Sequence, residues 1–369
     1  MNKISKILKR LFAPIDHMLL GITLALMAIG TWISIASTPA IAMKLGFAPF
    51  HFVKLHLLTL PIAVFIMLFT SFLKEKNIRM LAVIGYFSCV ILIACTLFFG
   101  TEIKGARRWI KIFGQSLQPS EFCKPVIAVI VAWLLSGQYS DRKFPGIILS
   151  IASVGLIVSL LLLQPDIGMT VIISGTLFAQ LFISGLSITM IVTTIASVVS
   201  AMFFLYFSFP HFATRIDKFL MKDEDVDIYQ VQKSIAAFKS GGFFGKGPTE
   251  GVIKTLIPDS HSDFVFSIIA EEYGFLVCMI VIGLFITFIA RVVSKIMHVS
   301  DMFTFIAVFG LLFQIIAQVT INICTSLNLI PTKGMTLPFI SYGGSSFLAS
   351  AISFGLIFAL TKKNLYNTI

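Results

Sequence analysis

Residues 264–290 read FVFSIIAEEYGFLVCMIVIGLFITFIA, an almost continuous apolar run whose charged residues are Glu271 and Glu272. An α-helix rises ~1.5 Å per residue, so about 20 apolar residues cross the ~30 Å hydrocarbon core of a bilayer. In lipid, a helix also satisfies the backbone hydrogen bonds of a segment internally. The run therefore predicts a transmembrane helix.

Apolar runs of similar length recur along the chain. The breaks between them predict helices over residues 17–37, 50–73, 78–99, 120–136, 144–163, 167–185, 188–208, 264–290, 301–325 and 338–361. The predicted fold class is all-α: a polytopic membrane protein of about ten transmembrane helices with one long extracytoplasmic loop, residues 209–262. Residues 1–369 are expected to form a single membrane domain.

The composition excludes a water-soluble protein. Apolar residues make up 57% of the chain, charged residues 12%, and the mean hydropathy is +0.97. An ordinary soluble domain carries about 25% charged residues. The runs also lack the alternating pattern of a membrane β-barrel.

The basic residues predict the topology. The N-terminal segment carries Lys3, Lys6, Lys9 and Arg10, and the expected inner turns carry Lys74, Lys76, Arg79, Arg142, Lys143, Arg291, Lys295, Lys362 and Lys363. Cytoplasmic loops are enriched in Lys and Arg. Both termini are therefore predicted to be cytoplasmic.

Two expected outer segments depart from this rule. The first contains Lys104, Arg107, Arg108 and Lys111 around Trp109, and the second is the long loop. The basic residues of the first either anchor a helix end among lipid headgroups or face an anionic group such as a pyrophosphate, for which the Arg fork is suited. Residue types alone leave both interpretations open.

The long loop contains a predicted helix. Tyr229, Val231, Ile235 and Phe238 place apolar groups on one face, and Gly241 followed by Gly242 provides a stop. The helix is expected to lie on the membrane or against the bundle.

Charged residues within the predicted spans need a partner or a function, because a charge at mid-membrane costs ~2.5–3.5 kcal/mol on insertion scales. Glu121 and Lys124 are three residues apart at a helix start, which predicts a structural ion pair. Asp166 follows Pro165 at a break between helices, where an N-cap is expected. Glu271 and Glu272 have no basic neighbour in the sequence.

Asp263 lies at the predicted membrane edge, immediately before a helix and close to Ser260, His261 and Ser262. One interpretation is an N-cap. The other is a catalytic carboxylate, since polar groups gather here at a position that an outer substrate could reach.

Four motifs in order resemble the SEDS family, the bacterial proteins of shape, elongation, division and sporulation. They are Gly105–Ile110 running on to Gln118–Glu121, then Gln164–Gly168, then Pro258–Phe264 with Ala270–Gly274, and finally Pro338–Ser346. The resemblance covers nearly the whole chain. Asp259 and Ser262 stand where the family usually has Glu and Thr, and both replacements keep the side-chain chemistry.

The resemblance implies a peptidoglycan glycosyltransferase that polymerises lipid II, the undecaprenyl-pyrophosphate-linked disaccharide peptide, at the outer face of the bacterial cytoplasmic membrane. Asp263 matches the family's essential aspartate and would act as general base on the acceptor 4-hydroxyl. The groups expected to bind the substrate are Arg107, Arg108, Lys111, Arg215, Lys218, His261, Lys333 and Ser341. A divalent cation, Mg or Mn, is a further expectation, with its ligands unknown.

The segment Pro331–Pro338 is similar to the cell-division branch of the family more than to the elongation branch. This implies work at the division septum with a class B penicillin-binding protein as transpeptidase and with other division proteins of the membrane. Three alternatives stay open: an elongation polymerase, a lipid II transporter, and a subunit that only recruits others. Against a transporter, we find no obvious inverted repeat, and the motifs gather at one face.

Overall fold

The computed structural model describes residues 15–103, 106–112, 115–185, 224–257, 260–330 and 334–362, together with isolated positions between 189 and 207. Nine of the described helices are apolar, and they fall where nine of the predicted spans were placed. They are α2 (His17–Lys44), α3 (His51–Ser71), α4 (Glu75–Phe99), α5 (Pro119–Ser140), α6 (Gly146–Leu163), α7 (Ile167–Ile183), α11 (Val265–Ile296), α12 (Met302–Ser326) and α13 (Gly344–Leu360).

Seven of these helices are long and apolar enough to cross a membrane, and α7 and α13 are shorter apolar helices. The prediction of an all-α, polytopic membrane protein is therefore confirmed. The predicted span over 188–208 lies largely outside the described residues, as does the first part of the loop over 209–262.

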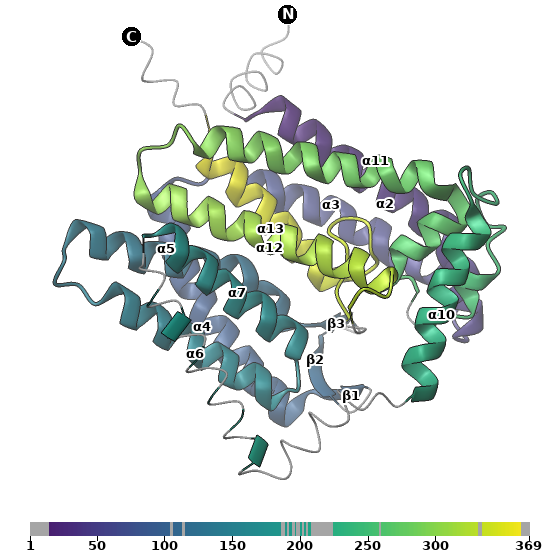
Figure 1. Ribbon diagram of the computed structural model, residues 1–369, viewed down its shortest axis with the longest axis horizontal. Coiled ribbons are helices and arrows are strands. Elements are labelled where there is room, and N and C mark those ends of the chain that lie inside the picture. The colour runs from purple at the N-terminus through teal and green to yellow at the C-terminus, as the bar shows by residue number, and fades with distance from the viewer. Residues whose placement is uncertain are drawn as a thin grey trace, which may run out of the picture.

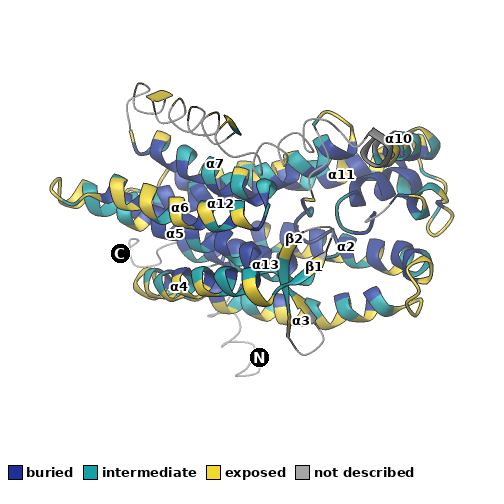
Figure 2. Ribbon diagram, turned by 90° about the horizontal axis from the view of Figure 1, so that it is seen from below, coloured by how far each residue is buried: buried dark blue, intermediate teal, exposed yellow. Residues whose placement is uncertain are grey.

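The helices pack side by side in one elongated bundle (Figure 1). Helix α13 packs on α3, α5 lies between α4 and α12, and α7 packs on α12. Buried residues follow the helix faces that meet one another, and exposed residues lie on the outward faces (Figure 2). Large apolar side chains such as Phe65 and Ile84 are among the exposed ones. Apolar residues on an outward surface are expected where the solvent is lipid.

The loop helix is present as α10 (Glu224–Gly241), which packs on α11. Ser234 fixes it there, because its Oγ lies 2.5 Å from the Oγ of Ser267 and 2.5 Å from the carbonyl oxygen of Ser326. The helix ends at the predicted glycines, where Gly242 has a φ of 58°.

The connection between the predicted spans 78–99 and 120–136 contains strands that the sequence did not predict. β1 (Thr101–Ile103), β2 (Ala106–Ile112) and β3 (Gln115–Leu117) form a small antiparallel sheet in that order. One predicted helix start is wrong: the last helix begins at Gly344 and not at 338, because Phe339 has a φ of 63° and residues 338–340 form a turn.

Helix α11 is interrupted at Gly274, which has φ 78° and ψ −177°. The part after the break, residues 275–296, is long enough at ~1.5 Å per residue to cross a bilayer by itself. The part before it, Val265 to Tyr273, therefore forms a separate short helix that follows Asp263.

The two ends of the bundle are distinguished by their polar contacts. At one end, Asp16 accepts hydrogen bonds from Arg291 (2.8 Å) and lies 3.0 Å from Lys295, which reaches the carbonyl oxygen of Thr361. We call this the Asp16 end. The opposite end, which carries the sheet, α10 and the turn before α11, is called the Asp263 end.

Candidate active site

Asp263 lies in the turn that leads into α11, and its residue is partly exposed. The N-cap position of α11 is Phe264, whose side chain makes no capping hydrogen bond. The N-cap interpretation of Asp263 is therefore wrong. The backbone of Gly334 lies beside the Asp263 carboxylate, because a Cβ built on Gly334 would come within 2.9 Å of Oδ2.

The position of this turn is fixed from two directions. Asn322 of α12 is buried and donates hydrogen bonds from Nδ2 to the carbonyl oxygens of Asp263 (3.0 Å) and Met335 (2.6 Å). The Ser341 hydroxyl donates to the carbonyl oxygen of Ser262 (2.6 Å) and accepts from the Leu337 amide (2.8 Å). Ser341, predicted as a substrate contact, thus uses its hydroxyl to join two loops.

His261 is held by aromatic packing. Its ring stacks on Phe52 of α3, with centroids 4.7 Å apart, and lies 5.5 Å from the Tyr342 ring. The Tyr342 amide also donates to the His261 carbonyl oxygen at 2.9 Å. Burial raises the pKa of Tyr342 to about 12, so its phenol stays protonated at neutral pH.

The partner of the two glutamates in α11 is Lys254, which lies in the short 3₁₀ turn Ile253–Thr255. Lys254 forms an ion pair with Glu272, and both side chains are almost completely buried. Glu272 also accepts from the Ser37 hydroxyl at 2.6 Å. Glu271 accepts from the amides of Ile253 and Lys254, each at 2.8 Å.

The same loop fills the break in α11. The amides of Lys246 and Gly247 donate to the carbonyl oxygens of Glu271 and Glu272, each at 3.0 Å. A Cβ on Gly245 would lie 2.2 Å from the Glu272 carbonyl oxygen, so only glycine fits this approach. The segment after α10 therefore replaces the hydrogen bonds that the interrupted helix loses.

Arg108 lies at a second polar cluster, where α6 ends and α7 begins. Its Nε donates to the Gln164 carbonyl oxygen (3.3 Å), another nitrogen contacts the Pro165 carbonyl, and a third lies 3.8 Å from Asp166. Asp166 also accepts from the Met169 amide, which confirms it as the N-cap of α7. Burial raises the pKa of Asp166, and the charge of Arg108 offsets part of this rise.

The surroundings of Asp263 and the Arg108 cluster are connected through the loop before α13. The backbone amide of Gln118 donates to the Ser345 hydroxyl at 2.9 Å. The Ser346 and Thr336 hydroxyls are hydrogen bonded to each other. Gln118 also contacts Asp166 through its side chain, at 3.4 Å. The loop of residues 334–343 and the first residues of α13 therefore lie between Asp263 and the Arg108 cluster.

The remaining predicted cations are distributed as follows. Arg107 forms an exposed pair with Glu102 at 3.3 Å, and Lys111 is exposed on the same strand. Arg215, Lys218 and Lys333 lie outside the described residues. The predicted pair of Glu121 and Lys124 is present, at 2.7 Å and buried.

Within the described ranges, no group of three His, Cys, Asp or Glu side chains could hold a metal ion. The residues that the structure brings together at Asp263 thus do not form a protein cage for Mg or Mn.

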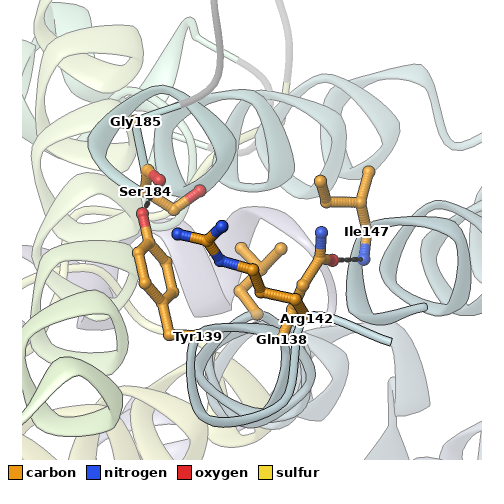
Figure 3. Close-up of a pocket in the computed structure, with 7 residues that line it drawn as sticks. Gln138, Tyr139, Arg142, Ile147, Ser184 and Gly185 are labelled. Atoms are coloured by element: carbon orange, nitrogen blue, oxygen red, sulfur yellow. Dashed lines mark hydrogen bonds between the residues drawn. The ribbon is translucent and has the colours of Figure 1, made fainter. Parts of the chain in front are cut away.

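A pocket of about 470 Å³ lies near the other end of α5, toward the Asp16 end, and contains none of the predicted site residues. Arg142 projects into it between Tyr139 and Gln138, whose side chains bind Ser184 and Ile147 (Figure 3). These two hydrogen bonds join α5 to the end of α7 and the start of α6.

Residues 16–366 match the model of the family FtsW, RodA and SpoVE, described as cell cycle proteins. The chain belongs to this family. The FtsW/RodA/SpoVE family is the one that the four sequence motifs resemble, so the SEDS interpretation is confirmed. The match includes both polar clusters and the loop that joins them.

Curated relatives carry the name probable peptidoglycan glycosyltransferase FtsW. The relative from Caulobacter vibrioides is 39% identical over 349 residues, which cover 94% of this chain and 89% of that protein. The relative from Legionella pneumophila is 31% identical and covers 100% of this chain and 96% of its own. The resemblance to the cell-division branch agrees with these names.

Solved structures show the same fold. A chain from a structure titled "Structural coordination of polymerization and crosslinking by a peptidoglycan synthase complex" has a TM-score of 0.74 and 26% identity, covering 94% of this chain and 97% of that one. The rod shape determining protein RodA of Thermus thermophilus has a TM-score of 0.66 and 24% identity, with coverages of 94% and 96%.

Sequence reasoning missed three residues that shape the site: Asn322, Lys254 and Gly334. Asn322 is a buried amide inside an apolar helix, where such a group needs partners, and this was a usable signal. Lys254 lies in a loop far from Glu272 in sequence, and Gly334 stands in an irregular segment. Neither carries a pattern that places it beside a carboxylate.

Proposed function

We propose that this chain is a peptidoglycan glycosyltransferase that polymerises lipid II, with Asp263 as the general base. The supporting observation is the placement of Asp263: a partly exposed carboxylate at one end of the bundle, held through its backbone by Asn322 and beside the turn that Ser341 fixes. The names of the relatives support the reaction class.

In the proposed reaction, the 4-hydroxyl oxygen of the acceptor sugar attacks the anomeric carbon of the donor. The new bond is carbon–oxygen, the bond between that carbon and the pyrophosphate oxygen breaks, and the lipid pyrophosphate leaves with the bonding electrons. The hydroxyl proton passes to Asp263. A positioned base typically contributes ~10²–10⁴-fold to such a step.

The leaving pyrophosphate needs positive charge close by. Arg107 and Lys111 are exposed on β2 and are proposed to contact it. Arg108 is different, because its guanidinium is engaged by the corner of residues 164–166. We infer that Arg108 holds this corner in place, and that Arg215, Lys218 and Lys333 stay candidates for the anionic site.

His261 is proposed to border the acceptor site, and Ser341 to position the turn of Asp263. A Mg or Mn ion stays a prediction, since the described residues offer no set of ligands for it. The Asp263 end is proposed to face outward with both termini cytoplasmic, as the basic residues at the Asp16 end favour.

A class B penicillin-binding protein is the proposed partner. A chain of similar fold comes from a structure titled as a peptidoglycan synthase complex of polymerization and crosslinking, which supports a pairing of this kind. Septal work with other division proteins follows from the FtsW names of the relatives. An elongation role is the alternative within the family.

The test is polymer formation from lipid II by the purified protein, with and without the partner and with and without divalent cations. The wild type should form glycan chains and Asp263→Ala should not. A vesicle assay for lipid II translocation runs beside it. Translocation with unchanged polymer in Asp263→Ala would favour a transporter and overturn the proposed function.

A further inference from the structure

A groove of about 440 Å³ lies between α4 and α5 toward the Asp16 end, far from the candidate active site. Its lining combines basic, acidic and apolar side chains: Glu75, Lys76, Arg79, Met80, Val83 and Trp133. None of them belongs to the proposed reaction. Several of these groups are exposed on the outside of the bundle.

The groove has a polar end and an apolar end. Glu75 begins α4 and Val83 lies eight residues further on, which is about 12 Å at the rise of a helix. Trp133 lies on the neighbouring helix and is partly exposed, at 39%. Tryptophan is enriched where the headgroups of a membrane meet its hydrocarbon core. The groove therefore runs from headgroup level to the first part of the acyl chains.

Positive charge dominates the polar end. Lys76 and Arg79 line it, and Lys74 lies just before α4. Glu75 opposes them, but it is partly engaged, at 3.4 Å from the Thr304 hydroxyl and 3.5 Å from Arg79. An exposed pair of this length contributes little. The start of a helix also favours an anion.

Arg79 is held in place without using all of its donors. Its guanidinium stacks on the buried ring of Phe303, 4.1 Å from the centroid. Its Nε is buried and has no hydrogen-bond partner among the residues that the structure describes. The buried Nε cannot contact a ligand, but the side chain is 33% exposed, so its terminal nitrogens can donate to a phosphate in the groove.

We propose that this groove binds one anionic phospholipid of the adjacent leaflet. The phosphate lies on Lys76 and Arg79, and the upper acyl chain lies along Met80, Val83 and Trp133. Charge decides between lipids, because a zwitterionic lipid carries no net charge for the two cations to attract. The bound lipid joins α4, α5 and, through Phe303, α12.

The test uses the three tryptophans of the chain. Trp32→Phe with Trp109→Phe leaves Trp133 as the only tryptophan, whose emission is excited selectively at wavelengths that tyrosine does not absorb. The variant is reconstituted in phosphatidylcholine vesicles that contain either brominated phosphatidylglycerol or brominated phosphatidylcholine. Brominated phosphatidylglycerol should quench Trp133 more than brominated phosphatidylcholine does. The apparent affinities of the two lipids should differ by about 5- to 30-fold, which is the range for one or two basic side chains at an anionic surface. Added salt should reduce the preference.

Lys76→Gln with Arg79→Gln should abolish the preference, whereas Arg142→Gln, at the same end but in the other pocket, should retain it. Native mass spectrometry of the chain with its natural tryptophans gives a second readout: phosphatidylglycerol should stay bound longer than phosphatidylcholine, and the double variant should lose this difference. Equal quenching and equal retention of the two lipids, or a preference that survives in the double variant, would overturn the proposal.

Discussion

Asn322 donates its side-chain amide to the carbonyl oxygen of Asp263 at 3.0 Å, and the same nitrogen donates to Met335 at 2.6 Å. One buried side chain thus joins the turn that carries the carboxylate to the segment that passes beside it. Both acceptors are backbone carbonyls, so the amide nitrogen must face them.

Asn322→Ala should move Asp263 and lower the turnover number more than it raises KM. Small misplacements of a reacting group cost up to ~10²-fold, so we expect kcat to fall about 10- to 100-fold with KM nearly unchanged. Gln314→Ala is the control, because it removes a similar buried bond, to the Lys124 carbonyl oxygen, from the same helix. Equal kinetic losses in both variants would contradict a positioning role of Asn322.

Lys254→Met should destabilise the protein by about 3–5 kcal/mol, because Glu272 would stay buried without its cation. Adding Glu272→Met should recover most of the loss, since the double variant buries no lone charge. Thermal unfolding in detergent measures both. Lys246→Met, at an exposed position of the same loop, serves as the control. An unchanged midpoint in Lys254→Met would show that the ion pair does not hold the loop on α11.

Substitutions at the two neighbouring arginines of β2 should have different effects, one on substrate binding and the other on stability. Arg107→Gln combined with Lys111→Gln should raise the KM for lipid II with little change in stability, because exposed ion pairs are worth about 0–1 kcal/mol. Arg108→Gln should lower the unfolding temperature, since it leaves buried Asp166 without its cation. Steady-state kinetics and thermal unfolding of the variants separate the two effects, and a shared pattern would contradict this division.

The Asp16 contacts should stabilise the protein in a pH-dependent way. Burial alone would raise the pKa of Asp16, but the hydrogen bonds from Arg291 and Lys295 outweigh it and lower the pKa to about 2. Because the folded pKa lies below the ordinary value of 3.8, the stabilisation is full above about pH 4 and is lost as pH falls through about 2.

Asp16→Asn should therefore cost about 1.5–3 kcal/mol at neutral pH, the range for a hydrogen bond to a charged group, and the difference from wild type should shrink between pH 4 and pH 2. Unfolding measured across this range tests the sign. Asp141→Asn, on an exposed turn at the same end, should change stability by less than about 0.5 kcal/mol. A difference in unfolding free energy between Asp16→Asn and wild type that became larger in acid would contradict the lowered pKa of Asp16.

The sequence was sufficient for features governed by local rules. The length of an apolar run predicts a membrane span. The spacing of three residues between Glu121 and Lys124 at a helix start predicts their ion pair. The break in α11 could not be seen, because Gly274 within an apolar run is compatible with a continuous helix. The backbone groups on either side of the break are hydrogen bonded to residues 242–247, about 30 positions earlier in the chain.

The sheet was missed for a related reason. Ala106–Ile112 pairs with two strands of three residues each, which are too short to give an alternating pattern. Hydropathy also cannot separate the turn at Phe339 from the helix that follows it. For the site, the motifs singled out Asp263. The residues that hold its turn in position lie on α12 and in the loop before α13, and no motif pointed to that contact.

The most direct measurement is a single-turnover assay of glycan bond formation by Asp263→Asn, with lipid II binding measured on the same protein. Asparagine keeps the size and polarity of the side chain but cannot accept the hydroxyl proton. We expect binding to stay within about 3-fold of wild type while bond formation falls by ~10²–10⁴-fold. Bond formation at the wild-type rate would contradict the role of Asp263 as the general base.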